Sequence, residues 1–219
     1  MKKSTIIITV ALILLVASIT VAATNSDPLF QLGEIFRDFQ NSQAQPIDGE
    51  VNENLAAAYH DNQILKAELE FRKKIQMVTD SEASADLCDR QIIENMVKDI
   101  IMVEEADRLG IAATQDEVDA MIHEQRRNYE VPEVKEYLDS YCKGAEMTID
   151  EYFSYLEQYA PTYISRQNLR TEIGKQYCEK NGLEYTNINP PQEMLDAIDA
   201  YIEELFEAHK GEIVYYIDN

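Results

Sequence analysis

The chain has 219 residues, of which 41 are Asp or Glu and 19 are Lys or Arg, so its formal net charge is −22 at pH 7. This balance excludes a nucleic-acid binder, because phosphate neutralisation needs a basic surface. Hydrophobic residues make up 45% of the chain, which is enough for a core, whereas low glycine and proline contents disfavour turn-dense sandwiches and barrels. The composition therefore predicts an acidic, helix-rich domain.

The first 23 residues have the layout of an export signal. Lys2 and Lys3 precede an uncharged, mostly apolar run over residues 6–23 that ends in small side chains. The run is long enough to span a bilayer, so a cleaved signal peptide and an uncleaved N-terminal membrane anchor both fit it. In either case we expect the rest of the chain outside the cytoplasm, membrane-anchored or secreted.

Residues 24–46 are predicted to be a tether with one short amphipathic helix in it. The segment 46–49 carries a turn signal, Asp-Gly, and marks the start of the main domain, 47–219. From 53 to 78 apolar residues recur at loose helical spacing and predict a helix. The apolar positions of the two predicted helices are Leu32, Ile35, Phe36 and Phe39, then Leu55, Tyr59, Leu65, Leu69, Ile75 and Val78.

The clearest helical pattern covers residues 92–103, and Gly110 supplies its stop. Thr114 and Glu117 then have the spacing of a capping box, in which each side chain bonds the backbone amide of the other residue. This capping box opens a helix that is predicted to end near Tyr129.

A short helix is predicted over 133–141, before the longest helical run of the chain. Thr148 and Glu151 form a second capping box, and the run that it opens extends to about Lys180. Pro161 lies inside this run and is expected to kink or divide it, because proline lacks the amide hydrogen of the helix ladder.

The last predicted elements are a helix over 191–209 and a strand over 213–217. The strand is the only convincing one in the sequence, and a lone strand needs a partner. The segment Pro46–Val51 is the best candidate, which predicts that the two ends of the domain meet.

The three cysteines, Cys88, Cys142 and Cys178, match no metal motif. An odd number in an exported protein leaves at least one thiol without a partner in the chain, and Cys142–Cys178 is the one disulfide worth testing. We expect all three to be helix-borne thiols that pack as small hydrophobes.

The histidines His60, His123 and His209 are scattered, and none has a ligand spacing with another. His123-Glu124 starts like a zinc-protease motif, but Arg127 stands where the second histidine is needed. Glycine-rich phosphate loops and G-x-S-x-G elbows are also missing from the sequence. We therefore expect no catalytic residues, no metal site, no cofactor and no enzymatic activity.

Tyrosines give the one suggestive pattern. Tyr152, Tyr155, Tyr159 and Tyr163 lie at offsets of 0, 3, 7 and 11, on one face of the long predicted helix. Tyrosine offers a flat apolar face and a hydroxyl, so such a face suits an extended apolar polypeptide in a groove. The alternative is that the face packs into the core. These four tyrosines are the candidate binding residues for an unfolded polypeptide, or client.

Three stretches carry a resemblance to a known family. An apolar helix over 88–109 closes in Glu105-Ala106 and Leu109-Gly110-Ile111, and the capped helix that follows begins Thr-Gln-Asp-Glu-Val-Asp at 114–119. Met147 to Phe153 opens the next helix, and Glu212 to Tyr215 follows the last one. This combination resembles the N-terminal chaperone domain of SurA/PrsA-type extracytoplasmic foldases.

The resemblance covers about 47–219 and implies a mostly α, multi-helix SurA N-terminal-like domain, with a C-terminal helix and a short terminal strand pair. It implies an ATP-independent chaperone that binds unfolded exported polypeptides, held at the membrane through 6–23 if these residues are uncleaved. The family often inserts a parvulin prolyl-isomerase domain before the last helix, but here only a loop over 182–191 stands there. Prolyl-isomerase activity is therefore not carried over. The alternative is a non-catalytic structural or adaptor domain with one dedicated envelope partner.

Overall fold

The computed structural model describes residues 27–43, 54–79 and 88–217. These residues form seven α-helices: α2 (Pro28–Gln43), α3 (Lys66–Thr79), α4 (Asp89–Arg108), α5 (Gln115–Asn128), α6 (Pro132–Ala145), α7 (Ile149–Asn181) and α8 (Gln192–His209). They also form the short 3-10 helix η4 (Lys210–Glu212) and the strands β1 (Leu55–Tyr59), β2 (Asn62–Leu65) and β3 (Ile213–Tyr215). The predicted fold class, mostly α with a C-terminal helix, is confirmed, and the expected short terminal strand pair is a three-stranded sheet.

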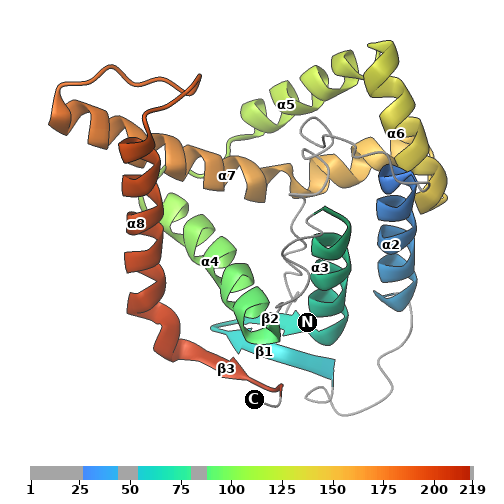
Figure 1. Cartoon of the computed structure of the whole chain (residues 1–219), viewed down its shortest axis with the longest axis horizontal. Helices are drawn as coiled ribbons and strands as arrows, with labels where there is room; N and C mark the ends of the chain where they lie inside the picture. Colours follow the sequence, from blue (N-terminus) through green and yellow to red (C-terminus); the bar gives the residue numbers. More distant parts are fainter. Residues whose placement is uncertain (1–26, 44–53, 80–87, 218–219) are drawn as a thin grey trace.

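The long helix α7 organises the molecule. It crosses the upper part of the view in Figure 1, with α5 above it, α6 beside its first half, and α4 and α8 below its second half. The antiparallel sheet lies at the opposite end of the molecule, in the order β2-β1-β3. The described part of the molecule thus has two ends, one formed by the sheet and the other by α7 with α5 and α6.

Local signals in the sequence set the helix ends. Both predicted capping boxes are formed, and in the second one Thr148 donates its amide to the Glu151 carboxylate at 2.7 Å. Gly182 closes α7 with a φ of 66°, a conformation that glycine adopts without strain. Pro161 does not divide α7, which continues as one helix through it.

The predicted helix over 53–78 is wrong in its first half. Residues 55–65 form the β1–β2 hairpin, and the helix begins only at Lys66. Ala56, Ala57 and Tyr59 are completely or almost completely buried, because β1 is the central strand and pairs on both sides. The apolar residues of this segment have only a weak helical spacing. Pairing with β3, which is far away in the sequence, outweighs it.

The last strand meets the start of the domain, as predicted, but with a different partner. β3 pairs with β1, in the register Ala57 with Tyr215, Ala58 with Val214 and Tyr59 with Ile213. The proposed partner segment, Pro46–Val51, lies outside the described residues. The sequence pattern misses β1 as a partner, because it places residues 55–59 in a helix.

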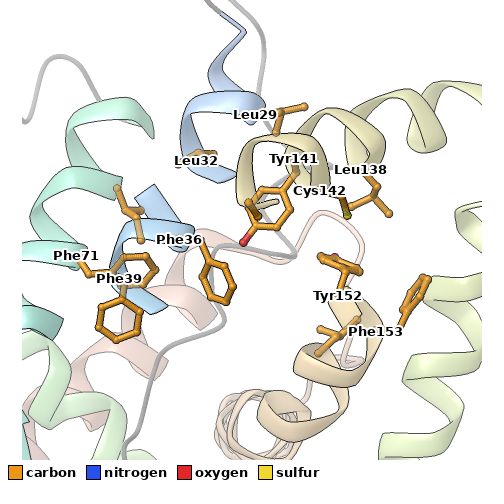
Figure 2. Packing of buried hydrophobic residues seen from close by; sticks show 13 residues of the cluster. Leu29, Leu32, Phe36, Phe39, Phe71, Leu138, Tyr141, Cys142, Tyr152 and Phe153 are labelled. Atoms are coloured by element: carbon orange, nitrogen blue, oxygen red, sulfur yellow. The ribbon is translucent and has the colours of Figure 1, made fainter. Parts of the chain in front are cut away.

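Most of the segment predicted to be a tether, 24–46, is folded: residues Pro28–Gln43 do not form a linker. This segment is the helix α2, and its apolar face is buried against α6 and α3 (Figure 2). The expected amphipathic positions Leu32, Phe36 and Phe39 are all buried, and the Phe39 ring stacks on Phe71 of α3 with centroids 4.4 Å apart. α2 is therefore part of the folded domain.

Two glycines let α2 and α6 approach closely. A Cβ atom on Gly33 would collide with the backbone carbonyl of Tyr141, and one on Gly144 would collide with the carbonyl of Phe30. Backbone atoms cannot move aside as a flexible side chain does, so this contact requires glycine on both helices.

An ionic cluster joins α3, α4 and α7. Asp99 of α4 accepts hydrogen bonds from Arg72 of α3, at 3.1 Å, and from Arg166 of α7. Arg166 is only 9% exposed, so its charge depends on this partner. Removing the Asp99 carboxylate would leave a buried guanidinium without this compensation.

We predict that Gly144→Ala destabilises the domain by about 2 kcal/mol or more, since the added methyl must push α2 and α6 apart. Urea unfolding followed by circular dichroism measures the change. Gly211→Ala is the matched control, because open space surrounds the Cβ position there. Equal stabilities of Gly144→Ala and the wild type would show that the helices are not held this close.

Glu68 predicts a pH dependence of stability. Its side chain is 3% exposed, one oxygen accepts the Leu65 amide at 2.9 Å, and the other has no hydrogen-bond partner among the described residues. Burial raises the pKa of Glu68 from 4.5 to about 7. The folded state therefore holds a proton that the unfolded state has released, and stability falls as the pH rises from about 4.5 to 7.

Ionisation of Glu68 lowers the free energy of unfolding by about 3 kcal/mol at most. Glu68→Gln keeps an acceptor for the Leu65 amide and carries no charge, so we expect it to be more stable than the wild type at pH 8 and nearly equal at pH 4. Urea midpoints at both pH values measure the difference. Glu70→Gln, at an exposed position of the same helix, should show no such pH-dependent gain.

Candidate functional site

The four candidate tyrosines lie on the first half of α7 and differ in their surroundings. Tyr152 is 3% exposed, and its ring meets the edges of Tyr141 at 5.9 Å and Phe153 at 5.2 Å (Figure 2). Burial raises the pKa of the Tyr152 hydroxyl above its ordinary value. A side chain enclosed in this way offers no surface to a partner. Tyr152 is therefore a core residue and not a binding residue.

Tyr155 and Tyr159 are half-buried at the edge of the same cluster. The Tyr155 ring packs edge-on against Phe36 of α2, with centroids 5.5 Å apart, and its hydroxyl donates to the Gln40 side chain at 3.2 Å. Burial raises the pKa of Tyr159, and the nearby Tyr155 and then Glu68 raise it further. Both residues combine an anchored ring with a remaining exposed part.

Tyr163 is half-buried in different surroundings. It packs against the cluster of Val118, Ala160 and Ile164, which joins α7 to α5. A helix of 33 residues is about 50 Å long, so residues on one face meet different neighbours along it. The structure therefore brings Tyr155 and Tyr159 together and places Tyr163 one turn farther along α7. We call these three residues the α7 tyrosine face.

Two residues of α5 extend the apolar surroundings of this face. Met121 and Ile122 are half-buried and pack against both clusters that contact the α7 tyrosines. In the sequence they are two apolar residues of the helix that is predicted to follow Thr114. Methionine is flexible and polarisable, which suits contacts that must adapt to different partners. Only the packing of α5 on α7 identifies them.

The cysteines do not form a reactive or bridged pair. Cys142 and Cys178 are buried in separate clusters, so the Cys142–Cys178 disulfide is not formed. Burial raises the pKa of the Cys142 thiol to about 11, which keeps it protonated near neutral pH. Cys88 is exposed at the start of α4, and the prediction that it packs as a hydrophobe is wrong.

The histidines are less scattered than the sequence indicated. Within the described residues, one group brings three possible metal ligands together: His60, His209 and Glu212, whose ligand atoms all lie within 4.8 Å of one another. His123 remains apart from them on α5. No local spacing reveals this group, because it depends on the pairing of β1 with β3.

Membrane contact was expected through residues 6–23, which lie outside the described residues. Among the helices that the structure does describe, none combines the length and the apolar character needed to cross a bilayer.

Comparison with known proteins gives one finding for the family. Residues 1–138 match the family model described as the SurA-like N-terminal domain. The match ends within α6, so the α7 tyrosine face lies beyond it. No curated protein and no solved structure gives a significant match.

The different burial of Tyr152 and Tyr163 predicts different losses of stability when each is replaced. Tyr152→Ser should destabilise the domain by about 3 kcal/mol or more, because it leaves a cavity between α6 and α7. Tyr163→Ser, at a half-buried position of the same helix, should cost about 1 kcal/mol. Urea unfolding of both variants tests this difference, and equal losses would contradict the assignment of Tyr152 to the core.

Proposed function

Because the chain belongs to the family of SurA-like N-terminal domains, we propose that it is a holding chaperone that binds unfolded exported polypeptides without ATP. The observation that carries the proposal is the family match, which spans 138 of the 219 residues. The signal-like layout of residues 1–23 supports an extracytoplasmic location, either anchored in the membrane or secreted.

We propose the α7 tyrosine face as the client-binding surface. Tyr155 and Tyr159 are anchored by α2 and the adjoining cluster, so they lose little conformational entropy when a partner binds. Each tyrosine offers an apolar ring and a hydroxyl, which together suit extended chains of varied sequence. A net charge of −22 keeps the protein soluble while apolar side chains stay accessible.

We also propose that the protein is not an enzyme. The segment between α7 and α8 spans residues 182–191, which is far too short for an inserted parvulin domain. A prolyl-isomerase activity would have to come from the helical domain itself. Proline-limited refolding of a test protein, measured with and without the chain, should proceed at the same rate.

Suppression of aggregation tests the chaperone proposal. A chemically unfolded client is diluted with and without the chain lacking residues 1–23, whose folding is first checked by circular dichroism and cooperative unfolding. We expect light scattering to fall in proportion to the chaperone concentration with no ATP present. If several clients aggregate unchanged beside the folded protein, the proposal is wrong, and a dedicated envelope partner becomes the better hypothesis.

Variants test the binding surface separately. The double variant Tyr155→Ser/Tyr159→Ser should need about fivefold more protein for the same suppression, which corresponds to ~1 kcal/mol of binding free energy. Tyr137→Ser is the matched control, because Tyr137 is 41% exposed on α6 and belongs to no part of the face. Comparable losses in both variants would exclude the α7 tyrosine face as the specific surface.

A further inference from the structure

The β1–β2 hairpin turn lies beside the end of α8. Tyr59 of β1 pairs with Ile213 of β3 in an antiparallel register, so the next residue on one strand, His60, faces the preceding residue on the other, Glu212. His209 ends α8 three residues before Glu212. The sheet and the helix end thus bring two imidazoles and a carboxylate together.

The ligand atoms of these side chains converge. His60 Nε2 lies 2.5 Å from Glu212 Oε2, and His209 Nδ1 lies 3.3 Å from the same oxygen. In a tetrahedral zinc site, ligand atoms about 2 Å from the metal are separated from each other by about 3.3 Å. Small side-chain rotations therefore suffice to place a cation between the three groups.

Ring contacts orient the two histidines, whose side chains are 47% and 39% exposed. The His60 ring stacks on Tyr59, with centroids 4.1 Å apart and planes at 28°, and Tyr59 is itself almost completely buried. The His209 ring stands perpendicular to His60, at 6.4 Å. His60 has a φ of 52° at the first position of the two-residue turn, where glycine is favoured in such turns. Histidine is thus held at a position that turn geometry does not favour.

A carboxylate lies on the other side of His60. Glu104 of α4 has its Oε2 atom 3.8 Å from His60 Nδ1, while Nε2 faces Glu212. Metal-binding histidines commonly direct one ring nitrogen to the metal and the other to a carboxylate, which fixes the tautomer and strengthens the ligand. Glu104 is positioned for this outer role.

We propose that His60, His209 and Glu212 bind a divalent transition-metal ion, with Zn²⁺ as the best-fitting ion and Glu104 as the outer carboxylate. Two imidazoles and one carboxylate are a common zinc ligand set that leaves a fourth position for water. Ca²⁺ and Mg²⁺ prefer sites built from oxygen, so the two nitrogen ligands disfavour them. The bound ion ties the hairpin to the end of α8 and stabilises the folded state against the unfolded one.

Zinc titration of the purified full chain tests the site. Isothermal titration calorimetry should give one Zn²⁺ per chain, and the melting temperature should rise on adding Zn²⁺ but not Mg²⁺ or Ca²⁺. His60→Asn and His209→Gln should each weaken binding at least tenfold. Asn is chosen at position 60 because it tolerates a positive φ, so the turn survives the substitution. Glu104→Gln should weaken binding about tenfold.

Matched controls separate this site from other zinc binding. His123→Gln changes the remaining histidine, and Cys88→Ser removes the exposed thiol; both should leave the affinity unchanged. Electron paramagnetic resonance of the Cu²⁺-loaded protein should show coupling to two imidazole nitrogens, reduced to one in His209→Gln. Zinc binding that survives both His60→Asn and His209→Gln, that is lost in a control, or that does not occur overturns the proposal.

Discussion

The pairing of β1 with β3 is the constraint on which the sheet end of the domain depends. It joins segments more than 150 residues apart and encloses the short central strand between two neighbours. The apolar side of this sheet then packs with α4 and with Phe206 of α8 in one cluster. A three-residue strand is not stable alone, so β3 depends on its pairing with β1 and on this shared cluster. The same pairing sets His60 beside Glu212.

The other end of the domain depends on close packing around α7. The glycine contact draws α2 against α6, and their aromatic side chains then meet the first turns of α7. Asp99 links α3 and α7 through two arginines, one of them buried. Such buried charges add little net stability but penalise any arrangement that leaves them unpaired. This packing leaves Tyr155 and Tyr159 partly exposed while it encloses Tyr152.

Features that depend on near neighbours in sequence were predicted well. The helices after residue 88, both capping boxes and the stop at Gly110 each involve residues a few positions apart, so local patterns in the sequence predict them. The hairpin over 55–65 was not predicted, because its alanine-rich strand carries no clear alternation. The role of α2 was missed for a different reason: an amphipathic pattern indicates a helix without indicating whether a partner for its apolar face exists.

Composition, helix periodicity and short motifs are local properties, and they were enough to indicate an acidic, mostly helical chain related to SurA-like N-terminal domains. Its tyrosine periodicity likewise named a face of α7, but periodicity does not distinguish a buried stripe from an accessible one. The folded structure was needed to show that Tyr152 lies in the core, that α2 belongs to the domain and that His60 lies beside His209 and Glu212. These outcomes depend on contacts between residues far apart in the chain. Such contacts produce no local pattern in the sequence, so they cannot be predicted from residue spacing.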